Sequence, residues 1–186
     1  MNSKPVKAVF LDRDGTLNEE ISYLYRPEDW RWLPGVIEGL LRLREAGYLL
    51  IVISNQAGIA RGYYTQEDVH ALHRWVNSRL ETYGAGIDAF YFCPHHPEFT
   101  PGGCACRKPS PLLIKKAAHD FGIDLSQSWM IGDKALDYEA GTAAGCASIL
   151  VETGYGTSER AALAPGASVV SNFSEAVEAV LKTLKR

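Results

Sequence analysis

Two aspartates lie two positions apart in the stretch "VFLDRDGTLN", directly after a run of apolar residues. Carboxylates about 4 Å apart repel each other by roughly 4 kcal/mol at an effective dielectric of 20, so Asp12 and Asp14 need positive charge nearby. The same Asp-x-Asp-Gly pattern is also common in ordinary turns. Two distant features favour chemistry over a turn: "GDKALD" supplies Asp133 after another apolar run, and "CRKPSP" supplies Lys108 just before a predicted helix.

These four residues predict a phosphate-binding site with a divalent cation. Mg²⁺ takes oxygen ligands, often one or two carboxylates together with the phosphate of a substrate. Held by Asp12 and Asp133, Mg²⁺ would offset the repulsion between the two early aspartates, and Lys108 would add a further positive charge. The chain has no Gly-x-x-x-x-Gly-Lys-Ser/Thr sequence, which argues against a nucleotide site of the P-loop type.

The groups present suit phosphoryl transfer to a carboxylate. An aspartate can attack phosphorus and form an aspartyl-phosphate, provided that a cation and a lysine neutralise the phosphoryl oxygens. We assign Asp12 as the nucleophile and Asp14 as the general acid and base, which protonates the departing alkoxide and then takes a proton from water. Ser54, which ends another predicted strand, could donate its hydroxyl to the phosphate. The alternative is that "SNQ" is only the polar start of a loop.

Four motifs give the chain a resemblance to a known family. "DRDGT", Ser54 in "VISNQ", Lys108 and "GDKALD" resemble the four motifs of the haloacid dehalogenase-like phosphatases, in the right order over about two-thirds of the chain. The resemblance implies Mg²⁺-dependent hydrolysis of phosphate monoesters through a phospho-aspartate. It also implies that the backbone carbonyl of Asp14 joins Asp12 and Asp133 as a ligand of the magnesium ion.

A second group of residues predicts a zinc site. "CPHHPEFTPGGCACRKP" contains three cysteines and two histidines within fourteen positions, laced with Pro and Gly; these are Cys93, His95, His96, Cys104 and Cys106. Four such ligands suit tetrahedral zinc in a closed, structural site, and chance clustering of buried thiols is the alternative. We choose His95 as the fourth ligand, although adjacency leaves His96 as a rival.

The predicted zinc would order a loop that has no core of its own. Zinc binding to small peptides is worth about 10–16 kcal/mol in apparent terms, which is ample for this. Arg107 and Lys108 follow Cys106 directly, so an ordered loop would fix both of them. We therefore expect the zinc to prepare the phosphate site without taking part in the chemistry.

The zinc loop and the four motifs together resemble one branch of that family, the D-glycero-D-manno-heptose-1,7-bisphosphate 7-phosphatases. "LDRDGTLN", "SNQAGIARG", "YFCPHHP", "CACRKP" and "IGDKALD" carry the resemblance. It implies removal of the 7-phosphate in the synthesis of nucleotide-activated heptose for bacterial surface glycans. The implied substrate contacts are Arg13, Glu20, Ile21, Ser22, Tyr23, Asn55, Gln56, Ala57, Arg107 and Lys134. From its chemistry, Arg61 is a further candidate for a second phosphate, or else a solvated loop charge.

Two alternative functions remain open at this point. Histidinol-phosphate phosphatase belongs to a related branch that shares the fold, the zinc loop and the motifs. A zinc-stabilised binding module without catalysis is the alternative from another class, and the joint presence of Asp12, Asp14, Lys108 and Asp133 argues against it. A phosphatase acting on nucleic-acid ends is disfavoured by the net charge of −3.

The elements that must position these residues alternate along the chain. Nearly continuous apolar runs predict strands over Ala8–Leu11, Leu49–Ser54, Ala89–Cys93, Trp129–Gly132, Ser148–Val151 and Ser168–Val170. Helices are predicted over Val36–Ala46, from Thr65 to about Leu80, and over Leu112–Phe121, Ala135–Ala144 and Ser174–Leu184. This order predicts an α/β fold, a doubly wound and mainly parallel sheet with helices on both faces.

The predicted sheet gathers the polar residues at one edge, because ligands of such sheets lie beyond the carboxyl ends of the strands. The long irregular stretches Gly15–Pro34 and Pro94–Pro111 leave the same edge. We expect one domain over residues 1–186, with a zinc loop at about 93–106 and no separate cap domain. Trp75, Trp129 and Cys146 should serve packing, and His70, His73 and His119 should lie on helix surfaces.

Composition fits this picture. The chain is 46% hydrophobic and 22% charged, with both signs interspersed, as in globular proteins of this size. It has no apolar stretch of about 20 residues. We therefore expect a cytoplasmic protein that acts on a small phosphorylated sugar as a monomer, without nucleic-acid or membrane partners.

Overall fold

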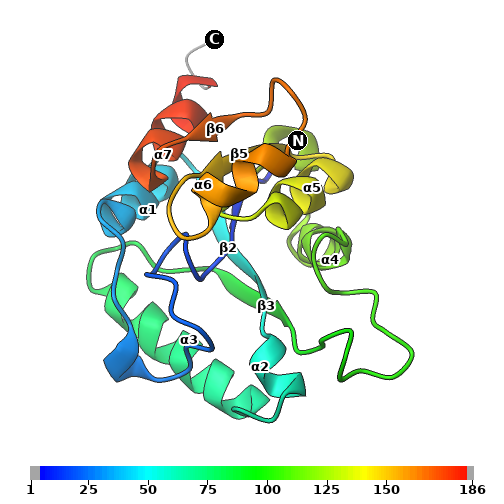
Figure 1. Ribbon diagram of the computed structural model, residues 1–186. Coiled ribbons are helices and arrows are strands. Elements are labelled where there is room, and N and C mark those ends of the chain that lie inside the picture. Colours follow the sequence, from blue (N-terminus) through cyan, green and yellow to red (C-terminus); the bar gives the residue numbers. More distant parts are fainter. Residues whose placement is uncertain (1–4, 184–186) are drawn as a thin grey trace.

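The computed structural model describes residues 5–183 as a six-stranded sheet with helices on both sides (Figure 1). The strands are β1 (Lys7–Leu11), β2 (Tyr48–Asn55), β3 (Ala89–Cys93), β4 (Trp129–Gly132), β5 (Ala147–Val151) and β6 (Val169–Val170). They lie in the order β3-β2-β1-β4-β5-β6, and every neighbouring pair is parallel. The predicted strands are confirmed to within one residue at each end.

The helices are α1 (Val36–Glu45), α2 (Ala57–Ala60), α3 (Gln66–Glu81), α4 (Leu112–Phe121), α5 (Ala135–Ala144), α6 (Gly156–Glu159) and α7 (Phe173–Lys182). The five long ones were predicted, and the end of the last prediction, Leu184, lies outside the described residues. The short α2 and α6, and the 3₁₀ turns at Pro27–Asp29, Leu125–Gln127 and Arg160–Ala162, were not predicted, because a single turn shows no periodicity.

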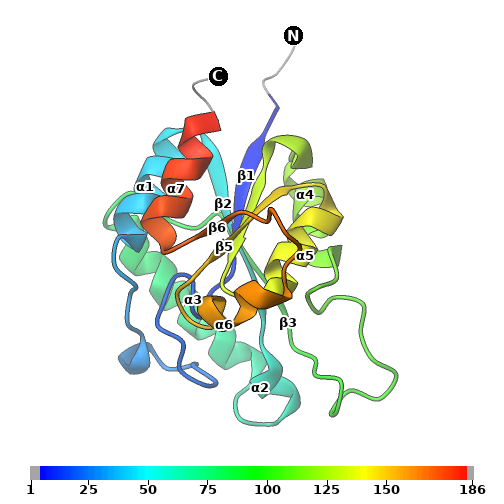
Figure 2. The same cartoon turned by 45° about the horizontal axis from the view of Figure 1, so that its top comes forward.

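Each face of the sheet carries its own apolar core. Val9 and Leu11 of β1 pack with α1, α3 and α7 on one side, whereas Ala8 and Phe10 pack with α4 and α5 on the other. Figure 2 shows the two helix layers on either side of the strands. Burial on both faces is why the strands are apolar at successive positions rather than alternate ones. One predicted zinc ligand, Cys93, belongs to the core on the α4–α5 side.

Helix α3 begins as its sequence predicts. Thr65 Oγ1 accepts a hydrogen bond from the backbone N–H of Asp68 at 3.1 Å, and the Asp68 carboxylate accepts one from the backbone N–H of Thr65 at 2.8 Å. This reciprocal pair satisfies two N–H groups that a helix start otherwise leaves free. The predicted stripe of Val69, Leu72, Val76 and Leu80 is buried.

The expectation that His73 lies on the helix surface is wrong. Its side chain is 3% exposed and stacks on Phe90 of β3 at 4.4 Å between ring centroids. Position 73 lies four residues after Val69 and three before Val76, so it belongs to the apolar stripe by spacing. His70 and His119 are exposed as expected, and Trp75 and Trp129 pack against the core while Cys146 is buried within it.

Both long irregular stretches lie at the carboxyl ends of the strands, as Figures 1 and 2 show. Only loops and helices connect the described strands, and the sheet is the one sheet that residues 5–183 form. Within that range no helix has the length and apolar character needed to cross a membrane.

Candidate active site

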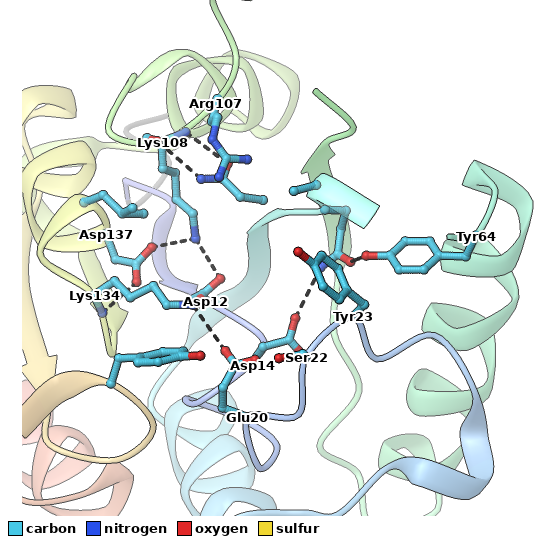
Figure 3. Close-up of a pocket in the computed structure, with 15 residues that line it drawn as sticks. Asp12, Asp14, Glu20, Ser22, Tyr23, Tyr64, Arg107, Lys108, Lys134 and Asp137 are labelled. Carbon is cyan, nitrogen blue, oxygen red and sulfur yellow. Dashed lines mark hydrogen bonds and ion pairs between the residues drawn. The ribbon is translucent and has the colours of Figure 1, made fainter. Parts of the chain in front are cut away.

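A pocket of about 230 Å³ opens where β1, β2 and β4 end (Figure 3). Its lining residues come from the ends of these strands, from the loops after β1 and β5, from the segments before α3 and α4, and from the starts of α2 and α5. They are Asp12, Asp14, Glu20, Ser22, Tyr23, Asn55, Gln56, Ala57, Tyr64, Arg107, Lys108, Lys134, Leu136, Asp137 and Tyr155. The lining is mostly polar and charged, which suits a phosphorylated ligand better than an apolar one.

Lys108 is the buried cation at the centre of the pocket. It is 2% exposed, and its ammonium group donates to Asp12 Oδ1 at 2.7 Å and to the Ile53 carbonyl at 2.6 Å. It also forms an ion pair with Asp137 Oδ1 at 2.6 Å. Burial works against the charged form, but the carboxylates of Asp12 and Asp137 outweigh it and raise the pKa of Lys108. The ammonium group is therefore charged at neutral pH.

Asp14 has a cation of its own. The buried guanidinium of Arg13 donates to both of its carboxylate oxygens, with Nη2 to Oδ2 at 2.7 Å and Nε to Oδ1 at 3.1 Å. Asn18 Nδ2 donates to Oδ1 at 3.0 Å and Gln56 Nε2 to Oδ2 at 3.3 Å. The repulsion between the two aspartates is thus offset by two cations, Lys108 beside Asp12 and Arg13 beside Asp14. The sequence indicated Lys108 for this purpose but not Arg13.

The carboxylates around Asp12 fit a divalent cation. Asp12, Asp133 and Asp137 each present an oxygen within 4.8 Å of the others. Asp133 is fully buried; its Oδ2 accepts from the backbone N–H of Tyr155 at 2.8 Å, while its Oδ1 has no partner among the described residues. Burial, followed by the charge of Asp12, raises the pKa of Asp133 to about 8; Lys108 pairs with Asp12 and Asp137, and Asp133 forms no ion pair within residues 5–183. A metal ion would supply a positive charge beside Asp133.

Two glycines make room for this cluster. Gly15 has a φ of +81°, and a Cβ atom there would overlap the Asp133 carboxylate. A Cβ at Gly154, where φ is +54°, would meet the same carboxylate. The close approach of backbone to carboxylate places the loop after β1 against the end of β4 and so brings the two predicted magnesium ligands, Asp12 and Asp133, together.

The cysteine cluster has the dimensions of a tetrahedral metal site. Cys93 Sγ lies 3.6 Å from Cys104 Sγ and 3.1 Å from Cys106 Sγ, and His95 Nδ1 lies 3.4 Å from Cys106 Sγ. A tetrahedron with bonds of about 2.3 Å has edges of roughly 3.8 Å, slightly longer than these. The residues present fit zinc. His95 belongs to the cluster, whereas the ring of His96 faces Arg61 and Glu98.

The predicted zinc loop is joined directly to the pocket. Arg107 Nη1 donates to the carbonyl of His95 at 3.1 Å. The Lys108 backbone N–H donates to Asn55 Oδ1 at 3.1 Å, and Asn55 Nδ2 donates back to the Lys108 carbonyl at 3.3 Å. These contacts attach the end of the zinc loop to the end of β2, and they set the guanidinium of Arg107 at the pocket wall.

Most of the predicted substrate contacts lie in the pocket lining. The structure brings together there Glu20, Ser22, Tyr23, Asn55, Gln56, Ala57, Arg107 and Lys134. It does not bring in the other two. Ile21 is 38% exposed outside the lining, and the Arg13 side chain turns inward to Asp14 and the Leu24 carbonyl. A substrate contact at Arg13 would therefore have to come from its backbone. Ser54, predicted separately as a phosphate donor, is also buried outside the lining, and its Oγ accepts a hydrogen bond from Gln56 Nε2.

Four lining residues were not predicted: Tyr64, Leu136, Asp137 and Tyr155. Asp137 had a signal, because it stands four positions after Asp133 in "GDKALD" and so lies in the first turn of α5. Burial, then the charge of Asp12, raises the pKa of Asp137 to about 6. No sequence signal indicated Tyr64 or Tyr155, because each reaches the pocket from a loop whose path the sequence pattern does not show.

Arg61, the candidate for a second phosphate, points away from the pocket. Its Nη2 lies 3.2 Å from His96 Nε2 and 3.4 Å from Glu98 Oε2, and its guanidinium lies over the Phe99 ring at 4.7 Å. In this structure Arg61 neither lines the pocket, as a phosphate-binding residue would, nor stands free in solvent as a loop charge. Arg61 instead connects α2 to the zinc loop.

Comparison with known proteins gives the class of the fold. The family model described as HAD-hydrolase-like matches residues 105–176. A crystal structure of D,D-heptose 1,7-bisphosphate phosphatase from B. bronchiseptica, complexed with magnesium and phosphate, matches with a TM-score of 0.87 at 34% identity over 96% of this chain and 99% of that one. The same enzyme from Burkholderia thailandensis matches with a TM-score of 0.70 at 32% identity over 97% and 99%. The fold is that of the haloacid dehalogenase-like hydrolases.

Curated relatives narrow this class. A D-glycero-alpha-D-manno-heptose-1,7-bisphosphate 7-phosphatase from Photorhabdus laumondii is 42% identical over 86% of this chain and 90% of its own length. A D-glycero-D-manno-heptose-1,7-bisphosphate 7-phosphatase from Thermosynechococcus vestitus is 46% identical over 82% of each chain. This chain therefore belongs to the heptose-bisphosphate phosphatase family of the haloacid dehalogenase-like hydrolases, and it is a phosphatase.

Proposed function

We propose that this phosphatase removes the 7-phosphate from D-glycero-D-manno-heptose 1,7-bisphosphate through an aspartyl-phosphate. The observation that carries the proposal is the buried cluster of Asp12, Lys108 and Asp133 at the end of the sheet, in a chain about 42–46% identical to relatives named for this reaction. A carboxylate that is held beside a lysine and a cation site is placed to attack phosphorus.

The roles of the first aspartate and the lysine follow from their contacts. Lys108 engages Oδ1 of Asp12, which assigns the attack on phosphorus to Oδ2 and leaves the ammonium group beside the phosphoryl oxygens. Mg²⁺ bound by Asp12, Asp133 and the Asp14 carbonyl would neutralise charge on the same oxygens. Ser54 and the backbone N–H groups after it would donate to the phosphate from the end of β2.

Asp14 serves as the general acid and base. It protonates the sugar alkoxide as the phosphorus–oxygen bond breaks, and it then takes a proton from the water that hydrolyses the aspartyl-phosphate. Arg13 holds this carboxylate through two N–H groups, which fixes its direction relative to Asp12. A side chain that must give and take a proton at one atom gains from such a fixed geometry.

The second phosphate of the substrate has a receptor in Arg107. Three cations line the pocket; Lys108 is bound by two carboxylates and Lys134 lies 3.2 Å from Glu20 Oε2. Within residues 5–183, Arg107 forms no ion pair and donates one N–H to the His95 carbonyl. Its planar guanidinium can therefore receive a phosphate, and the zinc loop that carries it would act as a structural support.

The setting of the reaction follows the same proposal. We propose that the enzyme acts as a monomer on a small phosphorylated sugar. A pocket of about 230 Å³ suits a compact sugar phosphate rather than a nucleic acid. We place the reaction in the cytoplasm, where the thiol ligands stay reduced.

The test is a comparison of kcat/KM for both anomers of the heptose bisphosphate and for histidinol phosphate, with Mg²⁺ present. We expect one of the heptose bisphosphates to be the best substrate. An advantage of histidinol phosphate of about tenfold, which is roughly 1.4 kcal/mol in transition-state binding, would overturn the substrate assignment. Absence of phosphate release from all three would favour a binding module.

A further inference from the structure

A one-way chain of hydrogen bonds runs from Tyr64 to two groups of the catalytic site. The Tyr64 hydroxyl donates to Gln56 Oε1 at 2.8 Å. Gln56 Nε2 in turn donates to Asp14 Oδ2 and to Ser54 Oγ, each at 3.3 Å. Figure 3 shows Tyr64 directed toward the side of the pocket that holds Asp14. Gln56 and Ser54 are 2% and 1% exposed, so water does not compete for these bonds.

The direction of this chain matters because a carboxamide has a donor end and an acceptor end of almost the same shape. With the donor end inward, Gln56 stabilises the Asp14 carboxylate and uses a lone pair of Ser54, which leaves the hydroxyl proton of Ser54 for a phosphate oxygen. With the amide turned over, its oxygen would face the carboxylate and would take the Ser54 proton. One orientation supports both proposed roles, and the other opposes both.

The ring of Tyr64 is held in place so that its hydroxyl faces Gln56. Its ring stacks on Tyr25 at 5.2 Å between centroids and packs over Gly58, where a Cβ atom would overlap it. The hydroxyl hydrogen of Tyr64 is used in the bond to Gln56 Oε1 at 2.8 Å. Burial raises the pKa of Tyr64 to about 12, and the phenol therefore stays a donor throughout the neutral pH range.

We propose that Tyr64 is a positioning residue that turns the donor end of Gln56 toward Asp14 and Ser54. The proposal rests on the proposed function, since it assumes the roles given there to Asp14 and Ser54. Tyr64 touches no reacting atom in this account. It acts on the reaction only through the orientation of one buried amide.

The test is Tyr64→Phe, which keeps the ring on Tyr25 and over Gly58 and removes only the hydroxyl. One hydrogen bond is worth about 0.5–1.5 kcal/mol, so we expect kcat on the heptose bisphosphate to fall about three- to tenfold while KM stays the same. Tyr63→Phe is the matched control, because this neighbouring phenol is 55% exposed and packs on Tyr23 instead; it should leave kcat unchanged.

A double-mutant cycle separates positioning from a general structural effect. In the Gln56→Ala background, Tyr64→Phe should have no further effect on kcat, because the amide through which it acts is gone. A loss of the same size in both backgrounds would overturn the proposal. An unchanged kcat of Tyr64→Phe in an active parent would overturn it as well, while the proposed function would stand.

A spectroscopic readout keeps the inference independent of the proposed function. If the parent releases no phosphate, the proposed function fails. The side-chain NH₂ signals of Gln56 in the ¹⁵N spectrum then test whether Tyr64 sets the orientation of this amide. Tyr64→Phe should shift these two signals and leave the backbone signals of α3 in place. Unshifted NH₂ signals would show that the phenol does not set the amide.

Discussion

Two clusters of potential metal ligands lie at the same end of the sheet and are built in opposite ways. The carboxylate cluster of Asp12, Asp133 and Asp137 stands at the ends of β1 and β4 and at the start of α5, and all three residues are buried. The thiol cluster has one member, Cys93, at the end of β3. Its other members, His95, Cys104 and Cys106, lie on the loop that follows, and Cys104 is exposed.

The difference lies in what holds each cluster in place. The ends of β1 and β4 are fixed by strand pairing and by two apolar cores, so the carboxylates are positioned by the fold before any ligand binds. The loop residues have no such core, and a bound metal would give this Pro- and Gly-rich segment one geometry. The clusters meet at three consecutive residues, Cys106, Arg107 and Lys108.

The largest effect should come from Asp12→Asn. The amide is a poor nucleophile for phosphorus, so we expect kcat to fall by at least about a thousandfold. Because strand pairing holds this position, the midpoint of thermal unfolding should change little. Phosphate release and circular dichroism on the same sample measure the two effects. Asp120→Asn is the control, since that carboxylate bonds Tyr91 and Lys116 on the surface away from the pocket, and it should keep the parent's kcat.

A kcat of Asp12→Asn within tenfold of the parent's would contradict the role given to the carboxylate cluster. It would mean that the carboxylate at the end of β1 is not the group that attacks phosphorus. Complete unfolding of Asp12→Asn would contradict it differently, by showing that the cluster supports the sheet rather than the reverse.

A smaller effect should follow from Cys104→Ser, which removes one ligand of the thiol cluster. We expect bound zinc to fall and amide hydrogen exchange over residues 93–106 to rise, while exchange in β1 and β4 stays the same. Arg107 would lose its fixed place, and a charged hydrogen bond to phosphate is worth about 1.5–3 kcal/mol. KM for the bisphosphate should therefore rise about tenfold to a hundredfold.

Cys146→Ala is the matched control, because Cys146 is buried in the apolar core on the α4–α5 side and belongs to neither cluster. It should retain zinc and keep the parent's KM. Unchanged loop exchange and unchanged KM in Cys104→Ser would show that the loop is ordered without its metal, and the proposed contrast between the clusters would be wrong.

The sequence predicts the strand ends better than it predicts the loops. The strands, the long helices and the residues directly after the strands were predictable, because continuous apolar runs and helical spacing are local signals. The contact of Arg13 with Asp14 was not predictable, because nothing in "DRD" shows that this side chain folds back. The partners of Arg61 were not predictable for a related reason: His96 and Glu98 lie 35 and 37 positions away on a loop without periodicity.

The last prediction concerns strand β3, which carries the first residue of the thiol cluster at its end. Strand β3, which ends at Cys93, rests on α3 through the stacking of His73 on Phe90, and neither ring nitrogen of His73 has a hydrogen-bond partner among the described residues. Burial, with a smaller effect from the charge of Arg13, lowers the pKa of His73 from its ordinary value near 6.5 to about 2. The folded protein therefore keeps this imidazole neutral.

The sign of the pH effect follows. Between pH 6.5 and pH 2 the unfolded chain binds a proton at His73 that the folded protein does not, so the free energy of unfolding falls as the pH falls. At pH 5.5 the loss amounts to about 1.4 kcal/mol relative to about pH 7.5. His73→Phe should lack this increment in urea unfolding measured from pH 7.5 to 5.5, whatever its packing cost, because that cost does not vary with pH. An equal slope in His73→Phe and the parent would mean that His73 is protonated in the folded state and that β3 is held on α3 in some other way.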